Sequence, residues 1–190
     1  MGMPAAVPPS VADSPYFTVQ QVLAMPDDGL RRELVYGELL VSPAPRLRHQ
    51  LVAFRLARWL AEYCDSEGIG RAFMSPADLT WGRDDVLVMP DVFVIGADEI
   101  AITEWQTLRN IPFVAEVTSP STRGHDRFRK RAVYRDQRVS CYWIIDPESG
   151  PAEVWMPGAS FPTYEAERLT WQPAGASSPF VVELAGLRAP

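Results

Sequence analysis

The sequence predicts one α/β or α+β domain with a central mixed β-sheet flanked by helices, and three observations support this prediction. The chain has 190 residues, a length that suits a single domain. Three nearly continuous apolar runs, 86–95, 111–118 and 141–146, have the composition of strands covered on both faces. An amphipathic stretch at 47–65 and a basic stretch at 121–137 have helical character and are interspersed with these runs.

The shorter elements complete this arrangement. Residues 1–15 contain four prolines and are expected to form a flexible tail, so the folded domain is expected over 16–190. Thr18 is a candidate N-cap of a short helix. Residues 32–42 have Gly37 between two β-rich runs, a pattern typical of a hairpin or a bulged strand. Further short strands are expected at 71–75, 78–81, 152–156 and 163–171.

The composition excludes several classes of protein. The net charge of −6 excludes a uniformly basic surface for nucleic acid, although not a local basic patch. Two cysteines are too few for a disulfide framework or a cysteine zinc site. No apolar run approaches the roughly 20 residues of a membrane span. The first residues lack the features of a signal peptide, so we expect a cytoplasmic protein with no membrane partner.

Two carboxylates stand in unusual places. Asp91 lies within the apolar run 86–95, and Glu116 lies within 111–118. A buried carboxylate costs several kcal/mol, on the order of a protein's whole stability margin, unless it is paired or bound to a metal. Pro90 implies a bulge or an edge just before Asp91. If the two strands are neighbours, both carboxylates lie at one site for a hard cation; the alternative is that each pairs with an arginine.

The basic stretch 121–137 supplies a third candidate element. The chain has 17 arginines and one lysine, Lys130, so an ammonium group is used at one place, although codon bias would also leave a single lysine. Asp126, Lys130 and Tyr134 are spaced to share one face of a helix. The alternative is a solvated helix with an internal Asp126–Lys130 pair.

Together these groups suit phosphodiester hydrolysis. Asp91 and Glu116 would hold Mg²⁺ or Mn²⁺, which would polarise a phosphodiester oxygen. The Lys130 ammonium would position the attacking water or stabilise developing negative charge. Arginines of the basic stretch would bind backbone phosphates. The candidates for this last role are Arg123, Arg127 and Arg131.

The chain also resembles a known family. Pro90-Asp91, followed after 24 residues by Glu116, is similar to the core of the PD-(D/E)XK nuclease superfamily. Longer stretches resemble the bacterial family of proposed restriction endonucleases called Uma-two, over about residues 16–185. They are FTVQQVLAMP at 17–26, RELVYGELLVSPAP at 32–45, VMPDVFVI at 88–95 and AEVTSPSTRGHDRFRKRAVYRDQRVSCYWIIDPE at 115–148.

This resemblance implies a restriction-endonuclease-like fold and a metal site at Asp91 and Glu116, with the backbone carbonyl of Val117 as a further ligand. The usual lysine position two residues after the glutamate holds Thr118 here, and the resemblance assigns the lysine to Lys130 on the next helix. Supporting roles are implied for Glu33, Glu38, His49, Asp78, Asp126 and Tyr134. The family usually has glycine where this chain has Arg138.

The sequence thus predicts a metal-dependent endonuclease that hydrolyses DNA, with Asp91, Glu116 and Lys130 as its catalytic residues. One alternative is an inactive nuclease-fold module that binds nucleic acid or a protein partner. Another is a hydrolase of RNA or small phosphodiesters. A homodimer is expected by analogy, since cutting two strands needs two sites.

Overall fold

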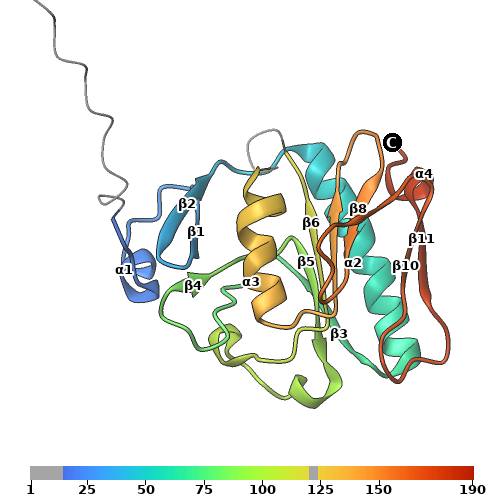
Figure 1. Cartoon of the computed structure of the whole chain (residues 1–190), viewed down its shortest axis with the longest axis horizontal. Coiled ribbons are helices and arrows are strands. Elements are labelled where there is room, and N and C mark those ends of the chain that lie inside the picture. The colour runs from blue at the N-terminus through green and yellow to red at the C-terminus, as the bar shows by residue number, and fades with distance from the viewer. Residues whose placement is uncertain (1–14, 120–123) are drawn as a thin grey trace, which may run out of the picture.

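The computed structural model describes residues 15–119 and 124–190 (Figure 1). Its centre is a six-stranded sheet in the order β3-β5-β6-β7-β8-β9. Neighbouring strands in this sheet are antiparallel except β6 and β7, which are parallel, so the predicted central mixed sheet is confirmed. The strands are β3 (Gly70–Met74), β5 (Val92–Gly96), β6 (Phe113–Val117), β7 (Cys141–Ile145), β8 (Ala152–Trp155) and β9 (Thr163–Glu165).

Two small sheets flank the central one. The first has the order β2-β1-β4, and the second pairs β10 with β11. Figure 1 shows the hairpin of β1 and β2 at one end of the molecule and β10, β11 and α4 at the other. The bounds are β1 (Arg31–Val35), β2 (Glu38–Ser42), β4 (Val86–Leu87), β10 (Arg168–Trp171), β11 (Phe180–Glu183) and α4 (Leu184–Leu187).

The first two helices begin and end close to where the sequence predicts. In α1 (Val19–Leu23), Thr18 and Gln21 form a capping box. The long helix α2 (Leu47–Glu67) ends at Gly68, whose φ of +66° is the left-handed conformation that glycine adopts readily. One stripe of α2 is buried, and it consists of Val52, Ala53, Leu56, Leu60 and Cys64. Two short 3₁₀ turns, η2 (Ala97–Glu99) and η3 (Trp105–Thr107), lie between β5 and β6.

The alternation of side chains along the strands divides the core into two halves. Phe113, Ala115 and Val117 of β6 pack in the cluster that contains α2. Val114 packs in the other cluster, together with Val133 of α3 (Arg131–Asp136). Figure 1 shows α3 in front of the sheet and α2 behind it. Even-numbered residues of β6, Glu116 among them, therefore lie on the α3 face.

The predicted hairpin at 32–42 is confirmed. Val35 of β1 pairs with Glu38 of β2, which leaves Tyr36 and Gly37 as a two-residue loop. Their φ values of +50° and +81° fit the type I′ turn that matches strand twist. The φ of +81° at Gly37 favours glycine, and a Cβ atom there would also lie 2.2 Å from a ring carbon of the exposed Tyr16 side chain, which would have to move.

The expected strand over 86–95 is wrong in one respect, because the structure has two strands there. β4 pairs with β1, whereas β5 belongs to the central sheet. The chain changes sheets at Met89, Pro90 and Asp91, and Pro90 has no N–H to continue a ladder. The expected strand at 78–81 is reduced to one bridge between Leu79 and Val88.

The remaining expectations fall partly outside the described residues. The expected tail, 1–15, lies outside them except for Pro15, as does the start of the helix expected at 121–137. The rest of that helix is a π-helical segment, η4 (His125–Lys130), continued by α3. Cys64 and Cys141 are free and buried, as expected for plain thiols. In the described ranges, no helix has the length and apolar character needed to cross a bilayer.

We expect Leu56→Ala in α2 to lower the free energy of unfolding by about 2–5 kcal/mol, because Leu56 is fully buried between helix and sheet. Phe54→Ala is the matched control on the same helix, since Phe54 is 57 % exposed. Urea unfolding followed by circular dichroism measures both. Equal losses for the two variants would contradict the assignment of the α2 core face.

Candidate active site

The pairing of β5 with β6 brings the two predicted carboxylates together. Val92 pairs with Ala115 in antiparallel register, so Asp91 just before Val92 lies beside Glu116 just after Ala115. Asp91 is 4 % exposed and Glu116 is 1 % exposed. The Val117 N–H donates a hydrogen bond of 2.8 Å to Asp91 Oδ2, which fixes one carboxylate to the strand of the other.

Lys130 reaches the same place from η4. Its Nζ lies 2.9 Å from Glu116 Oε1, 2.9 Å from Glu33 Oε1 and 3.5 Å from Asp126 Oδ1. The side chains of Lys130 and Asp126 are buried, so this helix face is not a solvated one, although the expected Asp126–Lys130 pair is present. The lone lysine is thus a buried ammonium among three carboxylates.

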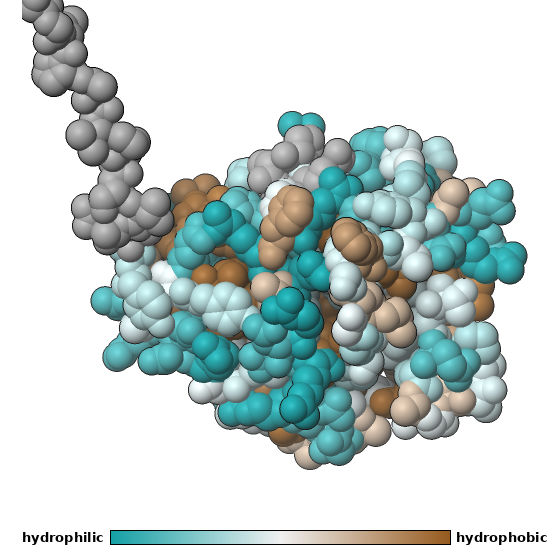
Figure 2. Space-filling view, viewed as in Figure 1, coloured by the Kyte–Doolittle hydropathy of each residue, from teal (hydrophilic) through white to brown (hydrophobic). Residues whose placement is uncertain are grey.

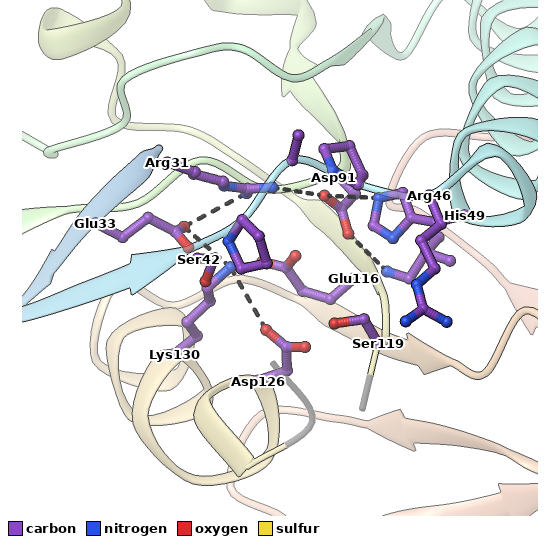
Figure 3. Close-up of a pocket in the computed structure, with 14 residues that line it drawn as sticks. Arg31, Glu33, Ser42, Arg46, His49, Asp91, Glu116, Ser119, Asp126 and Lys130 are labelled. Carbon is purple, nitrogen blue, oxygen red and sulfur yellow. Dashed lines mark hydrogen bonds and ion pairs between the residues drawn. The ribbon is translucent and has the colours of Figure 1, made fainter. Parts of the chain in front are cut away.

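Asp91 also has an arginine and a histidine on its other side. Arg31 Nη1 donates a hydrogen bond of 2.9 Å to Asp91 Oδ1, and His49 Nε2 lies 3.4 Å from the same oxygen. Arg31, Asp91 and His49 lie in a row along one side of the pocket (Figure 3). The sequence interpretation missed Arg31. Its position two residues before Glu33 on one strand was the available signal, because such residues share a face.

Further hydrogen bonds hold the carboxylates in place. The Met89 N–H donates to Glu33 Oε1 at 2.7 Å, so the segment that leads into the strand break also orients Glu33. The Tyr134 hydroxyl donates to Glu116 Oε1 at 2.6 Å. The Tyr142 hydroxyl donates to the backbone carbonyl of Asp126 at 3.0 Å. The groups around Lys130 are therefore fixed from three different elements.

The carboxylates and the basic side chains that contact them line an acidic pocket with a cavity of about 170 Å³ (Figure 3). The described lining residues include four buried carboxylates and two inner cations with a permanent charge. A third cation, Arg46, is exposed at the rim of the pocket. The cluster thus carries an excess of negative charge in a poorly solvated place. The four carboxylates are Glu33, Asp91, Glu116 and Asp126, and the two inner cations are Arg31 and Lys130.

The pKa values follow this imbalance. Burial raises the pKa of Glu116 well above its usual value; Lys130 opposes the rise, and the Asp91 carboxylate adds to it. Burial also opposes the charged form of Asp91, but His49 and Arg31 outweigh it and lower the pKa of Asp91. Burial alone would lower the pKa of Lys130, whereas the surrounding carboxylates raise it, so Lys130 stays an ammonium.

Two of the predicted supporting residues lie elsewhere. Glu38 is exposed at the start of β2 and forms an ion pair with Arg129. Asp78 lies in the loop after β3, where burial raises its pKa, and it does not line the acidic pocket. Glu33, His49 and Asp126 do line it, and Tyr134 contacts it through Glu116.

Two of the three predicted phosphate-binding arginines have partners within the protein. Arg127 pairs with the buried Glu153 of β8. The Arg131 guanidinium lies 3.6 Å from the centroid of the Trp155 ring, a cation–π contact. Arg123 lies outside the described residues. The surface seen in Figure 2, which carries α3, is mainly hydrophilic with separate hydrophobic spots.

The oxygen atoms that the pocket offers are of the type that hard divalent cations bind. Asp91 and Glu116 offer carboxylate oxygens, and Val117 also lines the pocket, where its carbonyl was the predicted further ligand. Over the described ranges, no group of three or more His, Cys, Asp or Glu residues forms a ready-made metal site. Mg²⁺ commonly uses one or two carboxylates and completes its shell with water and substrate phosphate, so two carboxylates with excess negative charge are adequate.

We expect Glu116→Gln to raise the free energy of unfolding at pH 7 in EDTA by about 0.5–2 kcal/mol. A carboxyl whose pKa is raised on folding destabilises the fold once the pH exceeds its unfolded value, and glutamine removes that charge. Glu38→Gln, at an exposed ion pair, is the control and should change stability by less than about 0.5 kcal/mol. Destabilisation by Glu116→Gln would show that Lys130 compensates the buried charge in full.

Comparisons with known proteins identify the family and a structure of similar fold. Residues 19–185 match the profile of the Uma2 family, described as "Putative restriction endonuclease". A crystal structure from Anabaena variabilis ATCC 29413, described as "a putative nuclease belonging to DUF820", has a similar fold with a TM-score of 0.70 and 20 % identity, covering 91 % of this chain and 98 % of that one. No curated protein matches the sequence. Since the family profile spans most of the chain, the protein belongs to the Uma2 family.

Proposed function

We propose that this protein is a divalent-metal-dependent endonuclease that hydrolyses DNA phosphodiester bonds in the acidic pocket. The observation that carries the proposal is the buried excess of carboxylates at the junction of β5 and β6. A protein keeps such a charge imbalance at a cost in stability, so a cationic ligand is the simplest reason for it. Membership of a family of nuclease type supports a nucleic-acid substrate.

Asp91 and Glu116 are the residues proposed to hold Mg²⁺ or Mn²⁺, with the Val117 carbonyl as a further oxygen ligand. When bound, the ion would act as a Lewis acid on the phosphodiester. Arg31 and His49 hold Asp91 from one side, and Tyr134 holds one oxygen of Glu116. Each carboxylate is therefore oriented before any ligand arrives.

Lys130 is proposed to position the attacking water and to stabilise negative charge that develops on the phosphate. Its Nζ contacts Glu116 and Glu33, next to the proposed metal ligands. An ammonium donates hydrogen bonds and accepts none, so its role is orientation and charge stabilisation rather than removal of a proton. Glu33 and Asp126 keep it in this position.

A Mn²⁺ titration followed by thermal unfolding tests the metal ligands. At a concentration about 100 times its Kd, Mn²⁺ should stabilise the wild type by about 2.7 kcal/mol. Asp91→Asn and Glu116→Gln should lose this stabilisation. Asp78→Asn, a carboxylate outside the pocket, is the matched control and should keep it. Equal Mn²⁺ stabilisation of Asp91→Asn and wild type would exclude Asp91 as a ligand.

A plasmid-nicking assay in Mn²⁺ tests the role of Lys130. Lys130→Met should retain the Mn²⁺ stabilisation yet cut roughly 100-fold more slowly or worse, because a preorganised donor acts mainly in the transition state. Metal binding without cutting by the wild type would favour the inactive binding module. Cutting of RNA or an activated small phosphodiester, but not of plasmid DNA, would favour the alternative substrates.

A further inference from the structure

A second cavity adjoins the acidic pocket. Its volume of about 460 Å³ falls in the range of small-molecule sites, roughly 300–1,000 Å³, whereas the acidic pocket is smaller. Arg31, His49 and Asp91 line both cavities and form the wall between them, with Ala44 and Pro45 also shared. A ligand whose charged end enters the acidic pocket therefore has room for a bulkier part next to it.

The chemistry of this second cavity differs from that of the acidic pocket. Beyond the shared wall it is mainly apolar, and its polar groups include the Gln50 amide and Asp27 near its rim. Methionine makes favourable sulfur–aromatic contacts, and an amide offers both donors and acceptors. These properties suit a flat aromatic ring with polar edges. The apolar lining residues are Leu30, Ala53, Met74, Pro76 and Met89.

The shared wall contains two buried nitrogen atoms for which the described residues provide no hydrogen-bond partner. They are Arg31 Nε and His49 Nδ1. Buried polar atoms are nearly always paired in proteins, but both of these are enclosed, so Arg31 and His49 would have to turn before a ligand in the cavity could pair with them. Their residues are otherwise fixed on Asp91 through Arg31 Nη1 and His49 Nε2.

We propose that this second cavity binds an unpaired nucleobase of the strand whose phosphate enters the acidic pocket. This inference rests on the proposed nuclease function and specifies its substrate. In a nucleotide, one sugar separates the phosphate from the base, and in this protein one side-chain wall separates the two cavities. A base that is stacked and paired in a duplex has to leave the helix before it enters such a cavity. The preferred substrate is therefore single-stranded, or unpaired at the bond that is cut.

Fluorescence anisotropy with labelled oligonucleotides in Ca²⁺ tests this assignment, because it measures binding without any need for cleavage. The probes are a short single strand, its perfect duplex, and the same single strand with abasic units in place of nucleosides. The wild type should bind the intact single strand roughly tenfold more tightly than the abasic strand, as a base stacked on a protein site typically contributes. It should also bind the intact single strand more tightly than the duplex.

Gln50→Trp is the variant that fills the second cavity, since Gln50 is exposed on α2 and lines this cavity but not the acidic pocket. It should lose most of the preference for intact over abasic strand and leave the abasic affinity unchanged. Met74→Ala, which removes a contact instead of adding bulk, is the second variant. Gln20→Trp on α1 is the control and should bind like the wild type.

An equal affinity of the wild type for the intact and the abasic strand would overturn the assignment. The same would follow if Gln50→Trp and Met74→Ala weakened binding of the intact strand and of the abasic strand by the same factor. These results differ from a failure of the nuclease proposal. A base preference that depends on Gln50, without any cleavage in Mn²⁺, would contradict hydrolysis but keep the base site. Cleavage that depends on Asp91 without any base preference would support hydrolysis but contradict the base site.

Discussion

The excess of buried negative charge at the end of β6 is the constraint on which the rest of the site depends. Four carboxylates face two inner cations, and each cation contacts more than one of them. Removing water from so many like charges is costly, and ion pairs repay only part of that cost. The fold meets this cost with hydrogen bonds from Met89, Val117 and Tyr134, which come from three separate segments. The carboxylates are thus held in fixed positions, and the charge imbalance that remains is the basis of the proposed cation site.

The strand break before Asp91 gives this arrangement its shape. A continuous strand over 86–95 would have paired with β1 and with the strands of the central sheet, and the two sheets would have been one. Because Pro90 cannot donate a backbone hydrogen bond, the chain leaves β4 and starts β5 in another sheet. Glu33 of β1 is thereby placed beside Lys130 rather than along the same ladder as Glu116. The break thus allows two sheets to supply carboxylates to one ammonium.

Sequence alone predicted the groups that violate local patterns. Asp91 and Glu116 stood out within apolar runs, and Lys130 stood out among arginines, because each departs from its surroundings in composition. Arg31 is followed directly by two further charged residues, Arg32 and Glu33, and gave no such contrast. The second cavity depends on how α2, β1 and the loop after β3 pack together, which no single segment encodes. Arg138 has a φ of +61°, the left-handed conformation that favours glycine, which fits the glycine that the resemblance led us to expect there.

The location of Lys130 on η4, and not two residues after Glu116 on β6, is compatible with its proposed role. Thr118 follows Glu116 by two residues and is buried, so a long cation there would have to fit among side chains already in place. Lys130 instead approaches from η4, and its Nζ still lies 2.9 Å from Glu116 Oε1. The i,i+4 pair with Asp126 helps to hold the lysine in this position. Since electrostatic stabilisation depends on where the ammonium lies and not on which element carries it, helix and strand are equivalent sources of this charge.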